Sequence, residues 1–277
     1  MTESQNSTVN VNNRGGGVTT TPLLSITDHG RFQLAMRLSP ITQIMRYNEK
    51  DRSPFQVRLN TDMEKPPIFA NRCVFKSQKV NAKEGKYFRE AMDLYIPTAK
   101  RELLAYNLDL CCGFNLVPPV VWREVPGHGA GSLQAWTQAQ SGSYWKHNFG
   151  YDYTRALSNP WMHRLVAFDI LIGNVDRHAK NWLMDTSGRV YAIDNGYAFP
   201  KRNDCRFISS LPLRGLVGQP LTNDLKQLLA TISAEKVRSI LNDVGFRCRE
   251  DSGVLRRLNY LKTLVAWEPV GRVQPIE

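Results

Sequence analysis

The spacing of apolar residues predicts strands in the first part of the chain. The pattern over residues 32–75 is typical of strands, because residues 55–59 alternate apolar and polar side chains and residues 68–75 form a second apolar run. Helical spacing follows at residues 99–110, where Gly113 supplies the expected stop signal. Beyond this helix the sequence predicts, in order, an extended segment, a turn and one more strand at residues 117–122, 127–131 and 132–137.

The second half of the chain carries a different pattern. It predicts, in order, a buried helix, a short strand and two amphipathic helical stretches at residues 161–172, 191–194, 221–244 and 255–264. A strand-rich half followed by a mainly helical half indicates an α+β fold with two lobes, and ligands bind in the cleft between such lobes. We expect the lobes at residues 23–137 and 138–277, after a disordered tail at residues 1–22 that is rich in Asn, Ser, Thr and Gly.

Composition narrows the class of protein. The 277 residues are 42% hydrophobic and 22% charged, which is typical of a globular protein. No apolar run approaches the roughly 18 residues of a membrane-spanning helix, and the N-terminal residues lack the apolar core of a secretory signal. Five cysteines without a C-x-x-C pair fit neither a disulfide framework nor a zinc site, so we expect a reducing, cytoplasmic compartment.

The chain is also basic, with a formal net charge of +11. Such a charge favours an acidic partner, which can be nucleic acid, an anionic lipid surface or a phosphate group. The basic residues are scattered, and runs such as Lys100-Arg101 are only pairs. An ordinary solvated basic surface is therefore an equally good interpretation of the charge.

One segment combines the side chains that phosphoryl transfer needs. Asp176 and Asn181 stand in the pattern D-x-x-x-x-N, and Asp194 follows in the sequence Ile-Asp-Asn-Gly. In kinases one Asp accepts the proton of the attacking hydroxyl, an Asn holds a metal ion, and a second Asp holds the metal ions that bridge the phosphates. A loop that returns within a few residues, followed by a hairpin, would bring all three side chains to one phosphate.

The loop sequence DRHAKN at residues 176–181 resembles the catalytic loop of the phosphoinositide 3/4-kinase-like and HipA-like atypical kinases. These kinases place a His after the Asp, in the pattern D-x-H-x-x-N. The resemblance implies a two-lobe protein-kinase-like fold that uses ATP and Mg²⁺, with Asp176 as the catalytic base. It also implies that Asn181 and Asp194 bind Mg²⁺, and that His178 supports the loop or the transferring phosphate.

The first half of the chain agrees with this resemblance, which extends over roughly residues 69–199. The family holds the α- and β-phosphates with a lysine on a strand, and a helix acid holds that lysine. Lys76 ends an apolar run and Glu102 opens the predicted helix, so these two residues are the candidates. Lys79 and Lys83 are nearby alternatives to Lys76.

The rest of the nucleotide site is less complete. We expect the adenine against a strand and its hinge, at Gln134, Trp136 and Thr137. The glycine-rich loop that covers the phosphates in ordinary kinases is missing, because residues 31–68 contain no glycine. Two segments remain alternatives for this cover, residues 38–41 and 51–54.

Other charged residues around the loop keep more than one interpretation. Asp169 lies on the apolar helix that leads into the loop, where a carboxylate needs a partner, so we expect it to bond the loop backbone or His178. Arg177 and Lys180 either meet phosphate or are solvated charges.

Together these observations predict an ATP- and Mg²⁺-dependent kinase. The favoured acceptor is a protein Ser or Thr hydroxyl, as in HipA-like kinases, and the alternative is a lipid headgroup, as in phosphoinositide kinases. The basic charge suits an anionic lipid or a nucleic-acid-associated target. Transfer of AMP in place of phosphate stays open. So does a different class of protein, a nucleotide-binding scaffold or a basic nucleic-acid-associated protein that transfers nothing.

Overall fold

The structure of the protein is a computed structural model. It describes residues 24–46, 54–65, 67–78, 96–150, 158–200, 211–243 and 248–268. The predicted disordered tail at residues 1–22 lies outside these ranges, as do Lys79 and Lys83.

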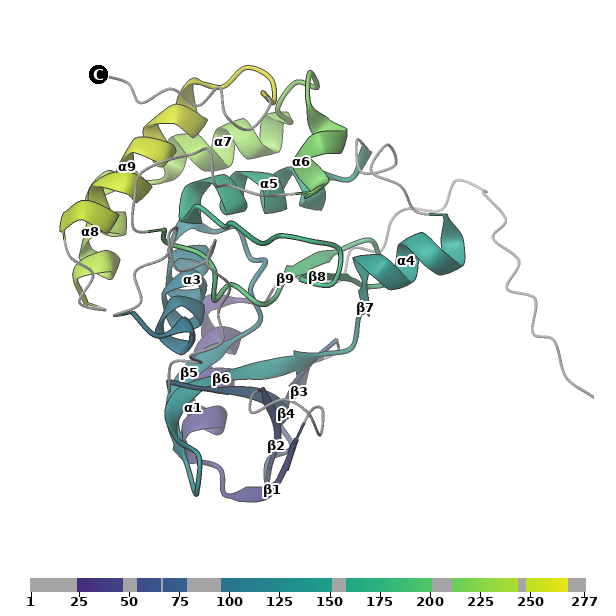
Figure 1. Cartoon of the computed structure of the whole chain (residues 1–277), viewed down its shortest axis with the longest axis vertical. Coiled ribbons are helices and arrows are strands. Elements are labelled where there is room, and N and C mark those ends of the chain that lie inside the picture. The colour runs from purple at the N-terminus through teal and green to yellow at the C-terminus, as the bar shows by residue number, and fades with distance from the viewer. Residues whose placement is uncertain are drawn as a thin grey trace, which may run out of the picture.

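In the part of the chain that the structure describes, a six-stranded antiparallel sheet forms the first lobe (Figure 1). Its strands β1 to β6 span Ile41–Arg46, Phe55–Leu59, Glu64–Lys65, Ile68–Ser77, Val120–Val125 and Gly129–Thr137. The order is β1-β2-β4-β6-β5, and β3 pairs with β4. The pairing of β4 with β6 sets Lys76 opposite Ser132, close to the end of the central strand.

A helix precedes the sheet where the sequence predicts strands. Residues Ile26–Leu38 form α1, so the prediction was wrong for residues 32–38. The apolar residues of this segment alternate as in a strand, but only Phe32 and Met36 are buried, whereas Leu34 and Leu38 are exposed. A capping box between the side chains and backbone of Ser25 and Asp28 starts the helix.

The second lobe is mainly helical, as the sequence predicts (Figure 1). Its helices are α4 (Gly142–Phe149), α5 (Pro160–Ile172), α6 (Leu211–Leu216), α7 (Asn223–Thr231), α8 (Ala234–Asp243) and α9 (Cys248–Thr263). The helical stretch predicted at residues 221–244 is two helices, because Ile232, the residue directly after α7, is in an extended conformation. A small antiparallel sheet of β7 (Gln140–Ser141), β8 (Trp182–Met184) and β9 (Val190–Ala192) lies between this lobe and the large sheet.

Helix α3 (Thr98–Cys112) connects the two lobes. It contacts β4, β5 and β6 in the first lobe and α7 and α8 in the second. Its residues Leu104 and Leu108 belong to the hydrophobic core of the second lobe, whereas α1 and the sheet strands share a separate core. The helix ends at Gly113, whose φ of 73° is left-handed, so the predicted stop signal is confirmed.

None of the helices in the described ranges has the length and apolar character needed to cross a membrane.

The approach of β4 to β6 allows a direct test of the sheet. A Cβ at Gly131 would lie 2.1 Å from the carbonyl oxygen of Lys76 and 2.8 Å from the ring of Phe75. We expect Gly131→Ala to force the two strands apart and to lower the free energy of unfolding by about 1–3 kcal/mol, measured by urea denaturation.

The matched control is Gly30→Ala on α1. A Cβ at Gly30 meets no heavy atom within 4 Å, so this change should raise the free energy of unfolding by about 0.5–1 kcal/mol. Equal stability of the Gly131→Ala variant and the unaltered protein would contradict the close contact between β4 and β6.

Candidate active site

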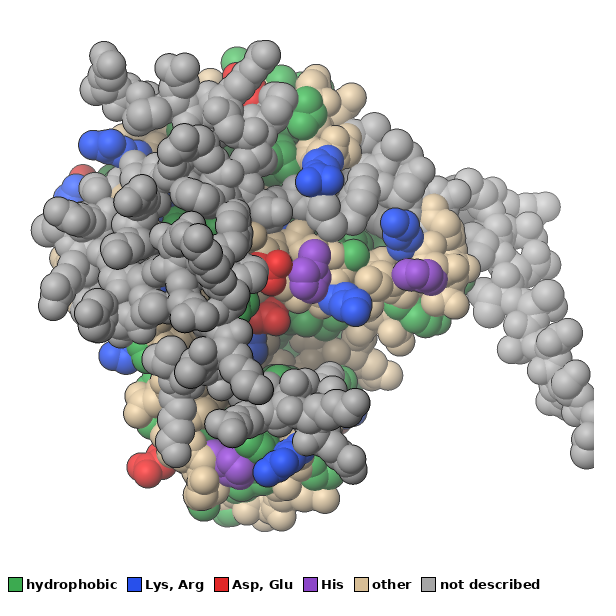
Figure 2. All heavy atoms as spheres, in the orientation of Figure 1, with side chains coloured by type: hydrophobic (Ala, Val, Ile, Leu, Met, Phe, Trp, Pro, Cys, Tyr) green, Lys and Arg blue, Asp and Glu red, His purple; other side chains and the backbone are tan. Residues whose placement is uncertain are grey.

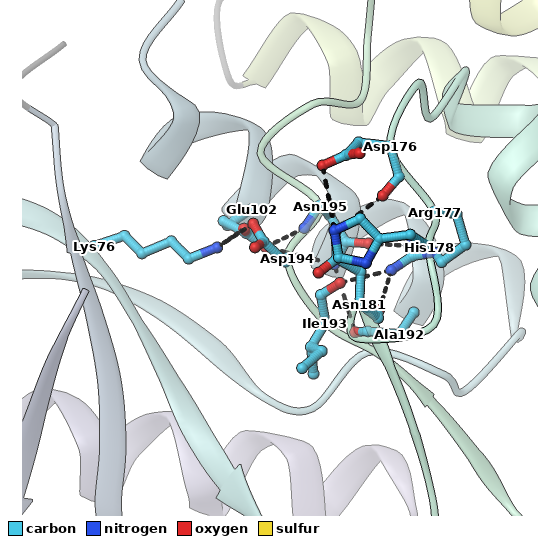
Figure 3. A network of polar contacts seen from close by, with 10 residues as sticks. All are labelled: Lys76, Glu102, Asp176, Arg177, His178, Asn181, Ala192, Ile193, Asp194 and Asn195. Atoms are coloured by element: carbon cyan, nitrogen blue, oxygen red, sulfur yellow. Dashed lines mark hydrogen bonds and ion pairs between the residues drawn. The ribbon is translucent and has the colours of Figure 1, made fainter. Parts of the chain in front are cut away.

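The loop predicted to be catalytic lies between α5 and β8. Helix α5 ends at Gly173, whose φ of 66° is left-handed and is readily adopted without a Cβ. Asn174 Oδ1 accepts a hydrogen bond from the backbone N–H of Asp176 at 2.8 Å. Asn181 Nδ2 donates to the carbonyl oxygen of Asp176 at 2.9 Å. The loop therefore returns on itself and brings Asp176 and Asn181 together (Figure 3).

Arg177 is fully buried and holds this loop from the inside (Figure 3). Its Nε donates to the carboxylate of Asp169, on α5, at 3.0 Å. Its Nη1 donates to the carbonyl oxygens of Asn181 and Ile193, the second at 2.6 Å, and its Nη2 donates to Asn195 Oδ1 at 2.6 Å. One guanidinium thus connects the helix, the loop and the segment that follows β9.

These contacts change the interpretation of two charged residues. The prediction that Arg177 meets phosphate or solvent was wrong, because its donors find acceptors inside the protein, as a buried guanidinium requires. Asp169 supports the loop through Arg177, rather than through the loop backbone or His178 as the sequence predicts.

The structure brings Lys76 and Glu102 together. Lys76 Nζ lies 2.5 Å from Glu102 Oε1 and 2.6 Å from Asp194 Oδ1. The Glu102 side chain is only 3% exposed, and its Oε2 also accepts the backbone N–H of Asn195 at 3.0 Å. Burial opposes the charge of Lys76, but Asp194 and Glu102 outweigh it and raise the pKa of Lys76. The lysine therefore stays charged, and it links β4, α3 and the segment after β9 (Figure 3).

Asp194 and Asn181 present oxygen atoms suited to a hard metal ion. The positive charge of Lys76 lowers the pKa of Asp194, which keeps this carboxylate ionised. The backbone of Asp194 has a φ of 54°, which is unusual for a residue other than glycine. Asn181 uses its Nδ2 to donate to Asp176, so its Oδ1 is the atom left to accept a ligand. Within the described ranges, no group of three or more His, Cys, Asp or Glu side chains could hold a metal ion.

Mg²⁺ fits this donor set. It is typically bound by one or two protein carboxylates, and water and substrate phosphates complete its shell. Asp194 supplies one carboxylate and Asn181 one amide oxygen. A site for a softer metal such as zinc would need several His or Cys ligands.

Asp176 has the surroundings of a candidate base. Burial raises the pKa of its carboxyl group above the ordinary value for Asp, even though nearby His178 acts in the opposite direction. His178 Nε2 lies 3.8 Å from Asp176 Oδ2, and its Nδ1 accepts the backbone N–H of Lys180 at 3.2 Å. Because Nδ1 is an acceptor in this contact, the geometry assigns the ring proton to Nε2, which faces Asp176.

A cleft of about 440 Å³ lies beside these residues, and residues of both lobes line it. Lys76, Asn181 and Asp194 line one part of it. The predicted adenine contacts Gln134, Trp136 and Thr137 also line it. In Figure 2 acidic, basic and histidine side chains gather in the middle of the visible face, between the lobes.

Two polar atoms of the cleft wall have no partner within the described protein. They are Gln134 Nε2 and Thr137 Oγ1, both on β6. Buried polar groups are normally hydrogen-bonded, so such atoms in a cleft are suited to a ligand that supplies the missing bond. The neighbouring ring of Trp136 is covered by the guanidinium of Arg72, 3.7 Å from the ring centroid.

The structure separates the two candidates for the phosphate cover. Residues 38–41 form the junction between α1 and β1, and none of them lines the cleft. Pro54, directly before β2, does line it, while residues 51–53 lie outside the described ranges. Residues 51–54 are therefore the better candidate for this cover, on the evidence of Pro54.

Residues 138–266 match the family model for phosphatidylinositol 3- and 4-kinase. This match covers less than half of the chain, and over these residues the chain is similar to the kinase domain of the phosphatidylinositol 3/4-kinase-like group. The predicted resemblance to this group and the prediction of a kinase are therefore confirmed for the domain.

The kinase domain also has a relative of similar sequence. This chain is 27% identical over 164 residues to Protein Rv2133c of Mycobacterium tuberculosis. The match covers 49% of this chain and 57% of Protein Rv2133c. The match therefore spans little more than half the length of the curated relative.

Solved structures show the fold of the kinase domain. The match to the Golgi casein kinase has a TM-score of 0.52 and 16% sequence identity, and it covers 85% of this chain and 75% of the casein kinase chain. Its form with Mn and ADP bound has a TM-score of 0.51, 16% identity and coverage of 85% and 74%. The match to the Helicobacter pylori proinflammatory kinase CtkA has a TM-score of 0.48 and 16% sequence identity, and it covers 83% of this chain and 94% of the CtkA chain. The predicted α+β, protein-kinase-like fold is confirmed.

One residue that joins the site was missed in the sequence. Asn195 is fully buried, accepts from Arg177 and donates its backbone N–H to Glu102. It connects the loop support to the Lys76–Glu102 pair. Its only signal was its place after Asp194, where Asn-Gly is more simply explained as a turn.

The buried pair of Asp169 and Arg177 gives a stability prediction. Asp169→Ala leaves the Arg177 guanidinium buried without its carboxylate, so we expect a loss of about 3–5 kcal/mol in the free energy of unfolding, measured by urea denaturation. The matched double variant Asp169→Leu/Arg177→Met removes both charges and should recover part of that loss. A single-variant loss below about 1 kcal/mol, the range of exposed ion pairs, would show that the pair does not hold the loop.

Proposed function

We propose that this kinase domain transfers the γ-phosphoryl group of ATP to a hydroxyl acceptor with the help of Mg²⁺. The observation that carries the proposal is that Lys76, Asn181 and Asp194 line one cleft, while Asp176 is bonded to Asn181 and Glu102 is paired with Lys76. These residues come from four separate segments of the chain. A scaffold that only binds nucleotide would have no chemical need for a base and two metal-binding side chains together.

Each residue has a role in the proposed reaction. The adenine lies along β6, where Gln134 and Thr137 offer unpartnered polar atoms. Lys76, held by Glu102, orients the α- and β-phosphates. Asn181 and Asp194 hold Mg²⁺, which neutralises phosphate charge when bound.

Asp176 acts as the base in this proposal. It accepts the proton of the acceptor hydroxyl while the acceptor oxygen forms a bond to the γ-phosphorus and the bond to the β-phosphate oxygen breaks. His178 supports the loop and the charge of Asp176 from 3.8 Å away. ADP and the phosphorylated acceptor are the products.

For the acceptor we propose a protein Ser or Thr hydroxyl, as in HipA-like kinases, with a lipid headgroup as the alternative. The Golgi casein kinase, named for a protein, shares the fold over 85% of the chain. The family model is named for a lipid, and the net charge of +11 suits either an anionic lipid or an acidic protein target. The free thiols of Cys73, Cys111 and Cys112 support our proposal of a reducing, cytoplasmic compartment.

The first experiment is incubation with ATP and Mg²⁺ followed by intact-mass measurement of the protein and of added casein, with phosphatidylinositol vesicles assayed in parallel. We expect a gain of one or more phosphate groups on protein. Asp176→Ala and Asp194→Ala should each lower the rate on the order of 10²–10⁴-fold, because they remove the base and a metal ligand. Lys146→Ala, on exposed α4, is the control and should leave the rate unchanged.

Other outcomes of this experiment are equally informative. A gain of one AMP would replace phosphoryl transfer with adenylylation. Phosphate found only on the lipid would move the acceptor to the alternative class. If no product forms while ATP still raises the melting temperature, the chain is a nucleotide-binding scaffold and the proposed transfer is wrong.

The pH dependence of kcat/KM tests the role of Asp176. A base must be ionised to accept a proton, so the rate should fall as the pH drops through the pKa of Asp176. Because burial raises this pKa, the midpoint of the fall should lie above the ordinary Asp value of about 3.9. The electrostatic interaction with His178 lowers the pKa of Asp176, so His178→Gln should move the midpoint to higher pH. An unchanged midpoint would argue against this pairing.

A further inference from the structure

The two cations of the catalytic loop have opposite surroundings. Arg177 is fully buried and bonded within the protein, as described above. Lys180 is exposed and lines the cleft together with Asn181 and Asp194. The structure therefore distinguishes two residues that look alike in the sequence. Arg177 supports the loop, and Lys180 faces the cleft.

The backbone that carries Lys180 is held in place from both sides. Its own N–H donates to His178 Nδ1 at 3.2 Å. The preceding carbonyl oxygen of Ala179 accepts the N–H of Ser143, at the start of α4, at 2.9 Å. The following N–H of Asn181 donates to the carbonyl oxygen of His178 at 3.0 Å. These hydrogen bonds fix the backbone of Lys180 at the wall of the cleft.

The charges around the cleft differ between its two lysines, Lys76 and Lys180. Lys76 lies against two carboxylates, Glu102 and Asp194, so its own charge is already balanced by the protein. Lys180 makes no ion pair with any residue that the structure describes. A triphosphate brought to this cleft would place several negative charges beside the carboxylates of Asp176 and Asp194, and such repulsion calls for a further cation.

We propose that Lys180 contacts the γ-phosphate of bound ATP and stabilises the negative charge of the phosphoryl group while it is transferred. The inference rests on the proposed function. In the reaction Asp176 takes the hydroxyl proton, the acceptor oxygen bonds to phosphorus, and the bond to ADP breaks. The ammonium group of Lys180 donates hydrogen bonds to the peripheral phosphoryl oxygens.

The position of Lys180 in the cleft favours the nucleotide over the acceptor as its ligand. It precedes Asn181, the proposed metal ligand. It shares the cleft with Gln140 and Ser141 of β7, the strand that follows β6, where the adenine is proposed to lie. A contact to an anionic group of the acceptor is the competing interpretation, and the experiment below separates the two.

Binding of ATP and of ADP, each with Mg²⁺, measured by calorimetry, tests the contact without relying on turnover. Because only ATP has a γ-phosphate, Lys180→Met should weaken ATP binding by about tenfold or more and leave ADP binding unchanged. Lys180→Arg keeps the charge and should retain most of the preference for ATP. Lys146→Met, which removes an exposed lysine from neighbouring α4, is the matched control and should change neither affinity.

Turnover gives the second measurement. Lys180→Met should lower kcat at least tenfold and leave the KM of the acceptor unchanged. Equal losses of ATP and ADP affinity, or no loss of either, would overturn the proposal. So would a variant that mainly raises the KM of the acceptor, since Lys180 would then bind the acceptor. If the unaltered protein transfers nothing but its preference for ATP still depends on Lys180, the proposed function fails and this contact stands.

Discussion

The buried ion pair of Arg177 and Asp169 is the interaction on which the rest of the site depends. A guanidinium in an apolar interior is stable only when its donors are satisfied, and these donors bond α5, the catalytic loop and the segment after β9. That one requirement fixes the spacing between the proposed base, on the loop, and the proposed metal ligand Asp194. The reactive side chains can remain partly exposed because a buried residue determines where their backbone lies.

Helix α3 supplies the second constraint. Its leucines pack into the core of the second lobe, while its Glu102 meets Lys76 from the sheet of the first lobe. Glu102 also binds the backbone of Asn195, which in turn accepts a hydrogen bond from Arg177. The two lobes are therefore joined by a continuous polar network beneath the cleft, and a shift of one lobe against the other would break charge-assisted bonds in that network.

Much of this could be predicted from the sequence, and the failures have physical causes. The loop motif could be recognised because D-x-H-x-x-N followed by Ile-Asp-Asn-Gly places several acidic, amide and histidine side chains within a short stretch of sequence. Helix α1 was missed because its apolar residues alternate as in a strand, and only the fold shows that two of them, Leu34 and Leu38, are left exposed. The roles of Arg177 and Lys180 could not be separated, because two cations in one loop look alike until burial distinguishes them.

The sequence by itself determined the order of strands and helices in broad terms, the basic charge and the residue types of the site. These are local properties that follow from side-chain periodicity, composition and short motifs. Only the tertiary structure decided which charge is buried, that Lys76 meets both Glu102 and Asp194, and that Pro54 borders the cleft. Those facts depend on contacts between residues far apart in the chain, and burial and pairing, which set the energy of a charge, are properties of the folded protein as a whole.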